Sequence, residues 1–180
     1  MAESAFAGNR WIYGLAYFGV TSVITLFQIM PIEIGPNGYP GPDLLLCITF
    51  AWILRRPQYV PTPLIALVFL ITDLLFMRPP GLWTALVVLG VEFLRAREAT
   101  SRELPFLAEW GMVTAVMVAM TLGNWLVLAV FMVGQAGFGL AVLQLVASIL
   151  TYPLIVMLSF LVFGVNKMSP GEIDEMGRPR

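Results

Sequence analysis

The sequence contains no histidine and only one cysteine, Cys47, and charged residues make up 12% of its 180 residues. The absence of histidine excludes Ser-His and Cys-His nucleophile pairs and zinc sites built on imidazole. The single cysteine excludes an internal disulfide and any multi-cysteine metal site. We therefore predict no catalytic residues, no metal and no cofactor, and we expect that the protein is not an enzyme.

The low charge also restricts the class of protein. A net charge of −1 excludes nucleic acid as a partner, because binding to a phosphate backbone requires a basic surface. Hydrophobic residues make up 59% of the chain, and the mean hydropathy is +0.86. A soluble domain of this size could not bury so much apolar surface. We therefore predict one all-α integral membrane domain, residues 1–180, in contact with the lipid bilayer.

Six apolar runs divide the chain, and we predict a helix for each because prolines and glycines mark their ends. They span residues 11–30, 44–54, 62–77, 82–94, 106–133 and 140–163, followed by a polar cytoplasmic tail, residues 164–180. No cleavage pattern follows the first run, so we expect a retained signal-anchor helix. The run 44–54 would be only ~17 Å long. Either the bilayer is locally thin, its polar ends snorkel, or neighbouring helices shield it.

Lysine and arginine positions predict the orientation. If all six runs cross the membrane with the N-terminus inside, the cytoplasmic side collects Arg10, Arg55, Arg56, Arg95, Arg97, Arg102, Lys167, Arg178 and Arg180. Only Arg78 remains on the outer side. Basic residues favour cytoplasmic loops, so we predict six transmembrane helices in one compact bundle with both termini inside.

Four acidic residues lie in or beside the apolar runs. Asp43 directly precedes the second run and is a candidate N-cap. Asp73 lies inside a membrane helix, which makes it a functional candidate, but we favour a structural pairing with Arg78 or contact with the interface. For Glu92 and Glu109 we expect ordinary interfacial pairing beside the arginine-rich loop, with Arg95 available to Glu92.

Other polar and small residues predict contacts between helices. Asn124 and Gln144 are candidates for interhelical hydrogen bonds, and Ala115 and Ala119 are spaced for close approach of another helix. Pro153 predicts a kink in the last helix. None of these features requires a ligand.

Three stretches of the chain resemble the MreD family of the bacterial rod-shape system. They are PDLLL at residues 42–46, WILRRPQYVP at 52–61 and LIALVFLITDLLFMRPPGLW at 64–83. We align Asp73 with the aspartate of the family pattern GLLxDLLxGxPLG, and Pro80 and Gly81 with its proline and glycine, which places this proline one residue farther from the aspartate than in the pattern. Arg78 and Pro79 depart from the small residues usual there. The resemblance runs from about Pro40 to the C-terminus, and the loop at 105–110 and PGEID at 170–174 are similar to alphaproteobacterial members.

The resemblance implies a multi-pass protein of the bacterial inner membrane and a non-catalytic component of the elongasome. Such a protein binds the transmembrane helix of MreC, a bitopic membrane protein. It works with a cell-wall glycan polymerase and transpeptidase, and indirectly with MreB, in lateral peptidoglycan synthesis and cell-shape maintenance. The fold would be similar to the substrate-binding subunits of energy-coupling-factor transporters.

Five residues are candidates for partner binding or for a structural role at the outer helix ends: Asp43, Asp73, Arg78, Pro80 and Gly81. We expect them to stabilise a hairpin that presents a groove to the partner helix. Under this hypothesis, Asp73→Ala weakens partner recovery more than Glu109→Ala does.

The alternative is a substrate-binding subunit of a small-molecule, vitamin-type transporter. Its ligand pocket would lie near the outer side, where Asp43, Asp73 and Arg78 are expected to converge. Against it, Val20 follows Ala16 where the coupling surface of such subunits typically has an alanine pair. A membrane enzyme is less favoured still, because no nucleophile–base pair is present.

Overall fold

The computed structural model describes residues 2–29, 41–55, 57, 60–97, 105–134 and 137–163. Within these ranges the protein forms six helices and no strands, which confirms the all-α prediction. The helices are α1 (Ala2–Ile29), α2 (Leu44–Arg55), α3 (Thr62–Leu75), α4 (Leu82–Ala96), α6 (Phe106–Val130) and α7 (Phe138–Phe163). The predicted tail, residues 164–180, lies outside the described residues.

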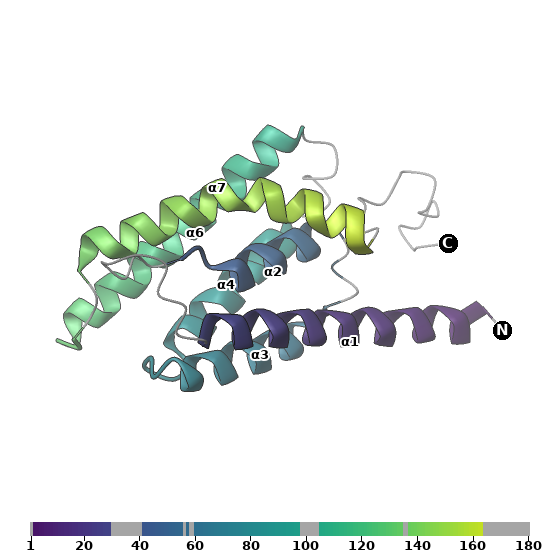
Figure 1. The fold of residues 1–180 in the computed structure, drawn as a ribbon, viewed down its shortest axis with the longest axis horizontal. Helices are drawn as coiled ribbons and strands as arrows, with labels where there is room; N and C mark the ends of the chain where they lie inside the picture. The colour runs from purple at the N-terminus through teal and green to yellow at the C-terminus, as the bar shows by residue number, and fades with distance from the viewer. Residues whose placement is uncertain are drawn as a thin grey trace.

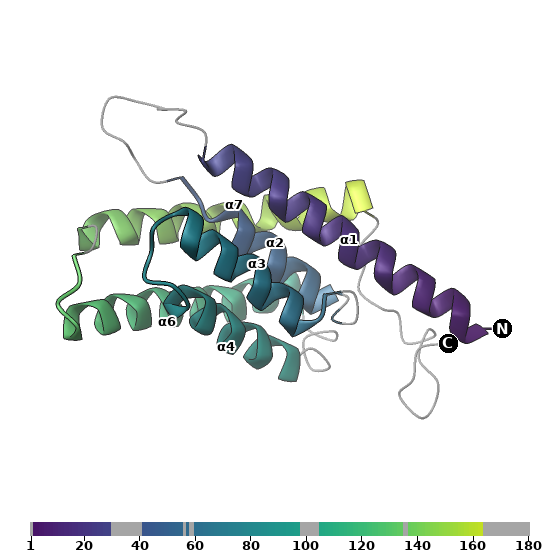
Figure 2. The ribbon, with the colours of Figure 1, turned by 90° about the horizontal axis from the view of Figure 1, so that it is seen from below.

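Five helices begin and end within a few residues of the predicted ranges, but α1 begins at Ala2 rather than at Trp11. The nine residues before the apolar run include three alanines and no proline, so nothing blocks the helix from extending. In both ribbon views the N-terminal part of α1 extends past the other helices (Figures 1 and 2).

The short helix α2 lies at the centre of the bundle (Figure 1). It contacts α1, α4 and α7, and every residue from Leu45 to Arg55 is buried. With 12 residues it is only about 18 Å long. Of the three explanations considered for its length, shielding by neighbouring helices is the one that this burial supports.

Large buried aromatic side chains fill the space around α2. The Tyr17 and Trp52 ring centroids lie 5.8 Å apart, and the Tyr17 hydroxyl is 2.8 Å from the Thr49 hydroxyl. The Trp52 indole N–H donates to the Ser159 hydroxyl at 3.4 Å. These contacts attach α1 and α7 to opposite sides of the central helix.

The outer surface of the bundle is apolar. Three helical segments are long and apolar enough to cross a membrane: Ile12–Ile29 of α1, Phe106–Val130 of α6 and Phe138–Leu161 of α7. The helices α2 and α3 are apolar but shorter. Large side chains on this surface are mostly exposed, with Leu107 at 70% and Leu150 at 64%. The apolar side chains of these helices are not buried by the rest of the chain. Their length and exposed apolar surface therefore indicate a membrane protein.

Helix ends gather at two opposite ends of the bundle. The start of α1 and the end of α7 lie at one end, and the turn between α3 and α4 lies at the other (Figures 1 and 2). At the first end, Arg55 contacts Glu109 at 3.0 Å, and Arg95 donates to the Val60 carbonyl at 3.0 Å. The α3–α4 end holds Asp73, Pro80 and Gly81.

Candidate functional site

Asp73, in the last turn of α3, is fully buried and caps the start of α4. Its Oδ2 accepts hydrogen bonds from the Gly81 N–H at 3.1 Å, the Thr84 N–H at 3.2 Å and the Thr84 hydroxyl at 2.8 Å. The first N–H groups of a helix have no partner inside that helix, and a carboxylate satisfies them well. The structural role that we favoured is present, but the partner is α4 rather than the Arg78 side chain or the interface.

The turn between α3 and α4 needs the residue types found there. Met77, two residues past the end of α3, has a φ of 51°, and the Arg78 N–H donates to the Asp73 carbonyl at 3.0 Å. Gly81 has a φ of 88°, a left-handed conformation that favours glycine. Pro80, the residue before Gly81, is exposed, and its ring fixes φ and so stiffens the turn. Asp73, Pro80 and Gly81 thus act together to close the hairpin.

Asp43 is the N-cap of α2, as predicted. Its Oδ1 accepts from the Leu46 N–H at 3.0 Å, and its own backbone N–H donates to the Ser148 hydroxyl of α7 at 2.8 Å. Burial raises the pKa of this carboxyl, while the Leu46 hydrogen bond and the charge of Arg78 act in the opposite direction.

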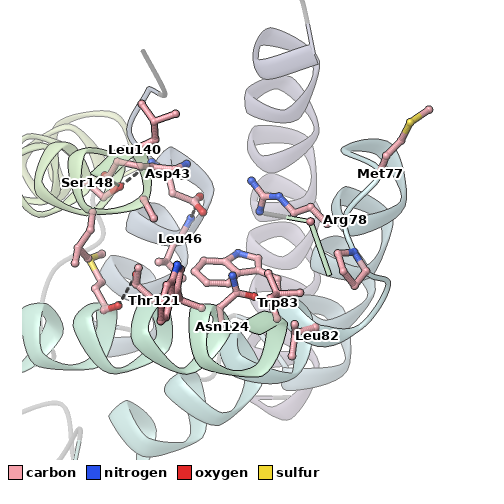
Figure 3. A pocket seen from close by; sticks show the side chains of 18 residues that line it. Asp43, Leu46, Met77, Arg78, Leu82, Trp83, Thr121, Asn124, Leu140 and Ser148 are labelled. Atoms are coloured by element: carbon pink, nitrogen blue, oxygen red, sulfur yellow. Dashed lines mark hydrogen bonds between the residues drawn. The ribbon is translucent and has the colours of Figure 1, made fainter. Parts of the chain in front are cut away.

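A cavity of about 500 Å³ opens beside Asp43 (Figure 3). Its walls come from the start of α2, the α3–α4 turn, the C-terminal half of α6 and the N-terminal half of α7. The polar side chains in its lining are Asp43, Arg78, Thr121, Asn124, Gln144 and Ser148, and two indoles, Trp83 and Trp125, lie among them. A cavity of this size and mixed lining is typical of a small-molecule site.

The predicted site residues therefore separate into two groups. Asp43 and Arg78 share the cavity, whereas Asp73 and Gly81 form the α4 cap and do not line it. We predicted that Asp43, Asp73 and Arg78 would converge. Asp43 and Arg78 do so at the cavity, but Asp73 does not. Sequence reasoning also missed Trp83, although its place two residues after the Pro-Gly pair could have suggested it.

Two further expectations about polar and small residues differ from the structure. Asn124 and Gln144 are half-buried at the cavity wall, and in the described part of the chain their side chains form no interhelical hydrogen bond. Ala115 and Ala119 are exposed on α6, so they allow no close packing within this chain. Pro153 lies inside α7, as predicted.

Glu109 forms an ion pair, as expected, but inside the bundle rather than at its surface. It is fully buried, and its Oε1 lies 3.0 Å from the Arg55 guanidinium and accepts from the Tyr152 hydroxyl at 3.2 Å. Arg55, 6% exposed, also donates to the Ala51 carbonyl at 3.2 Å. The pair joins α2 to α6. Glu92 does approach Arg95 as expected, at 3.9 Å.

Among the described residues, no three cysteine, aspartate or glutamate side chains gather so that they could hold a metal ion. Comparison with protein-family models, curated proteins and solved structures found no match to this chain.

Proposed function

We propose that this chain is a non-catalytic, MreD-like component of the bacterial elongasome, which binds the transmembrane helix of an MreC-like protein and assists lateral peptidoglycan synthesis. The observation that carries the proposal is the cap formed by Asp73 on Gly81 and Thr84. The aspartate, proline and glycine of the family pattern have one shared task here, which is to close the α3–α4 hairpin. A chance match to the pattern would not require its residues to form one structural unit. The joint role of these residues therefore supports the resemblance.

The proposal includes six membrane crossings with both termini in the cytoplasm. Arg55 and Arg95 lie near the end of the bundle where α1 starts and α7 finishes, and Arg78 lies at the opposite end. This distribution is what the preference of basic residues for cytoplasmic loops favours. The inner membrane is the corresponding location.

We place the partner helix against α6. Gly111, Ala115 and Ala119 recur at four-residue spacing and are all exposed, and a Cβ added at Gly111 would meet no atom within 4 Å. Small residues at this spacing allow two transmembrane helices to approach closely. The MreC-like protein, with its single helix, is the occupant that the family resemblance implies.

Affinity purification of the tagged protein from its native membranes in mild detergent tests this proposal. We expect co-elution of a bitopic coiled-coil protein with a glycan polymerase and a transpeptidase. Ala115→Leu with Ala119→Leu should reduce that recovery at least severalfold because leucine prevents close approach. Ala85→Leu, at an exposed alanine of α4, is the matched control and should leave recovery unchanged.

Asp73→Ala should also reduce recovery, because the start of α4 loses its acceptor. Glu109→Ala is not a neutral comparison, since Glu109 is buried in an ion pair. The exposed Glu92→Ala replaces it as the control. Equal recovery from all variants and wild type would contradict the docking surface.

The cavity favours a second candidate, the substrate-binding subunit of a small-molecule transporter. Its volume of about 500 Å³ and its mixed polar and apolar lining suit a ligand of modest size. The same purification separates the two candidates. Recovery of an ATPase pair with a membrane coupling subunit, in place of cell-wall synthases, would overturn the elongasome proposal.

A further inference from the structure

Two opposite charges face the same cavity without forming an ion pair. Asp43 enters from the start of α2 and Arg78 from the α3–α4 turn (Figure 3). The charge of Arg78 acts on the Asp43 carboxyl, yet within the described residues the two groups are not within 4 Å of each other. An acid and a base held apart across a cavity can each bind a group of a ligand placed between them.

The Arg78 guanidinium has no carboxylate and no carbonyl as a partner among the described residues. Its guanidinium instead contacts rings, with its central carbon 5.3 Å from the Phe76 centroid and 6.0 Å from the Trp83 centroid. Guanidinium groups bind phosphate and carboxylate with paired hydrogen bonds, and all the donors needed for such a pair remain available. The rings orient the group and leave its donors for an anion.

Trp83 adds a second unsatisfied donor. Its indole N–H is shielded from solvent and has no hydrogen-bond partner in the part of the chain that the structure describes. A buried N–H without an acceptor is costly. An anion beside Arg78, with a small adjustment of the indole, would supply this acceptor, since the ring lies against the same guanidinium.

We propose that this cavity binds a compact zwitterion, with a protonated amine held by Asp43 and a phosphate or carboxylate held by Arg78 and the Trp83 indole N–H. The amides of Asn124 and Gln144 line the same cavity and offer further donors and acceptors. The site has one formal charge of each sign, so a ligand of either charge alone would leave one of them unpaired.

The required chemistry has two sources: the headgroup of an amine-bearing phospholipid, or a free molecule such as an amino acid. The inference does not rest on the elongasome proposal, because the site lies in this chain alone. Binding to the isolated protein can therefore succeed or fail whatever partners the protein has.

The test uses the full-length protein purified in detergent, with O-phosphoethanolamine, glycine and inorganic phosphate as soluble probes. We expect a saturable rise in the unfolding temperature with a zwitterion and a much weaker one with phosphate. In nanodiscs, a rise with phosphatidylethanolamine over phosphatidylglycerol, with no response to glycine, would assign the lipid source. The converse pattern would assign the free molecule.

Two variants examine the two charges separately. Asp43→Asn keeps an acceptor for the Leu46 N–H, and asparagine caps helices as well as aspartate does, so α2 should remain capped. Arg78→Gln leaves the backbone bond from residue 78 to Asp73 intact. Each should raise the Kd of the zwitterion about tenfold or more by removing one charged hydrogen bond. Glu92→Gln, at an exposed position outside the cavity, should not change it.

Three results would overturn the proposal. One is the absence of saturable stabilisation of the wild-type protein by every zwitterionic probe. Another is equal stabilisation by phosphate or by phosphatidylglycerol, which would mean that Asp43 plays no part. The third is unchanged affinity in both variants while each still unfolds cooperatively.

Discussion

At the scale of single residues, Glu109 shows how this chain accommodates a buried charge. Glu109 is fully buried, and a lone ionised carboxylate there would be very unfavourable. Arg55 and the Tyr152 hydroxyl supply the compensating contacts, at 3.0 Å and 3.2 Å. Breaking such a pair is costly because one charge remains without its partner, whereas replacing both members with apolar residues is often neutral.

We therefore expect the single variants Arg55→Met and Glu109→Leu each to lower the free energy of unfolding by ~3 kcal/mol or more. The double variant Arg55→Met with Glu109→Leu should recover most of the loss. Thermal unfolding of the purified proteins in one detergent measures all three. A double variant no more stable than the worse single variant would show that the pair itself contributes net stability.

At the scale of helices, α3 and α6 end in the same way. In each, a methionine just past the last turn adopts a φ of 51°, and the following residue's N–H returns to a carbonyl five residues earlier. This is the glycine-type C-terminal cap, formed here without glycine. Met77 and Met132 are 95% and 93% exposed, so packing within the chain does not offset the cost of a left-handed conformation.

Met132→Gly should consequently stabilise the protein by about 0.5–1 kcal/mol, after the greater freedom of glycine in the unfolded chain is counted. Met157→Gly is the matched control. Met157 is 58% exposed inside α7, where glycine should lower stability by a similar amount. Differential scanning fluorimetry of both variants decides the matter, and destabilisation by both would contradict this account of the cap.

At the scale of the whole molecule, a short and fully enclosed α2 organises the bundle. Neighbouring helices cover its sides, Asp43 anchors its start to Ser148 of α7, and Arg55 anchors its end to Glu109 of α6. Such a helix needs less length than one exposed to lipid, because protein rather than hydrocarbon surrounds its ends. The longest apolar helices lie around it with large side chains exposed.

Cysteine labelling tests the proposed topology. In a Cys47→Ala background, Met77→Cys should react in intact cells with a maleimide that cannot cross the membrane, since Met77 is 95% exposed at the proposed outer end. Arg97→Cys, at the end of α4, should react only after permeabilisation. Labelling of Arg97→Cys from outside, or protection of Met77→Cys, would refute the six-crossing arrangement.

The sequence by itself determined the elements of this protein. Long apolar runs without charges predict helices, and prolines and glycines mark their ends, because both effects are local along the chain. For the same reason Asp43 was recognisable as an N-cap, since its acceptor role involves a residue only three positions away. The start of α1 was the main error, because the residues that precede the apolar run also favour a helix.

Only the tertiary structure decided which distant groups meet. Asp73 accepts hydrogen bonds from the start of α4 rather than from the Arg78 side chain. Glu109 forms an ion pair with Arg55 of α2, and Arg78 faces Asp43 across a cavity. The spacing of residues within one helix predicts which face they share. It does not predict which neighbouring helix covers that face, because the neighbours are set by how the side chains of all six described helices pack together.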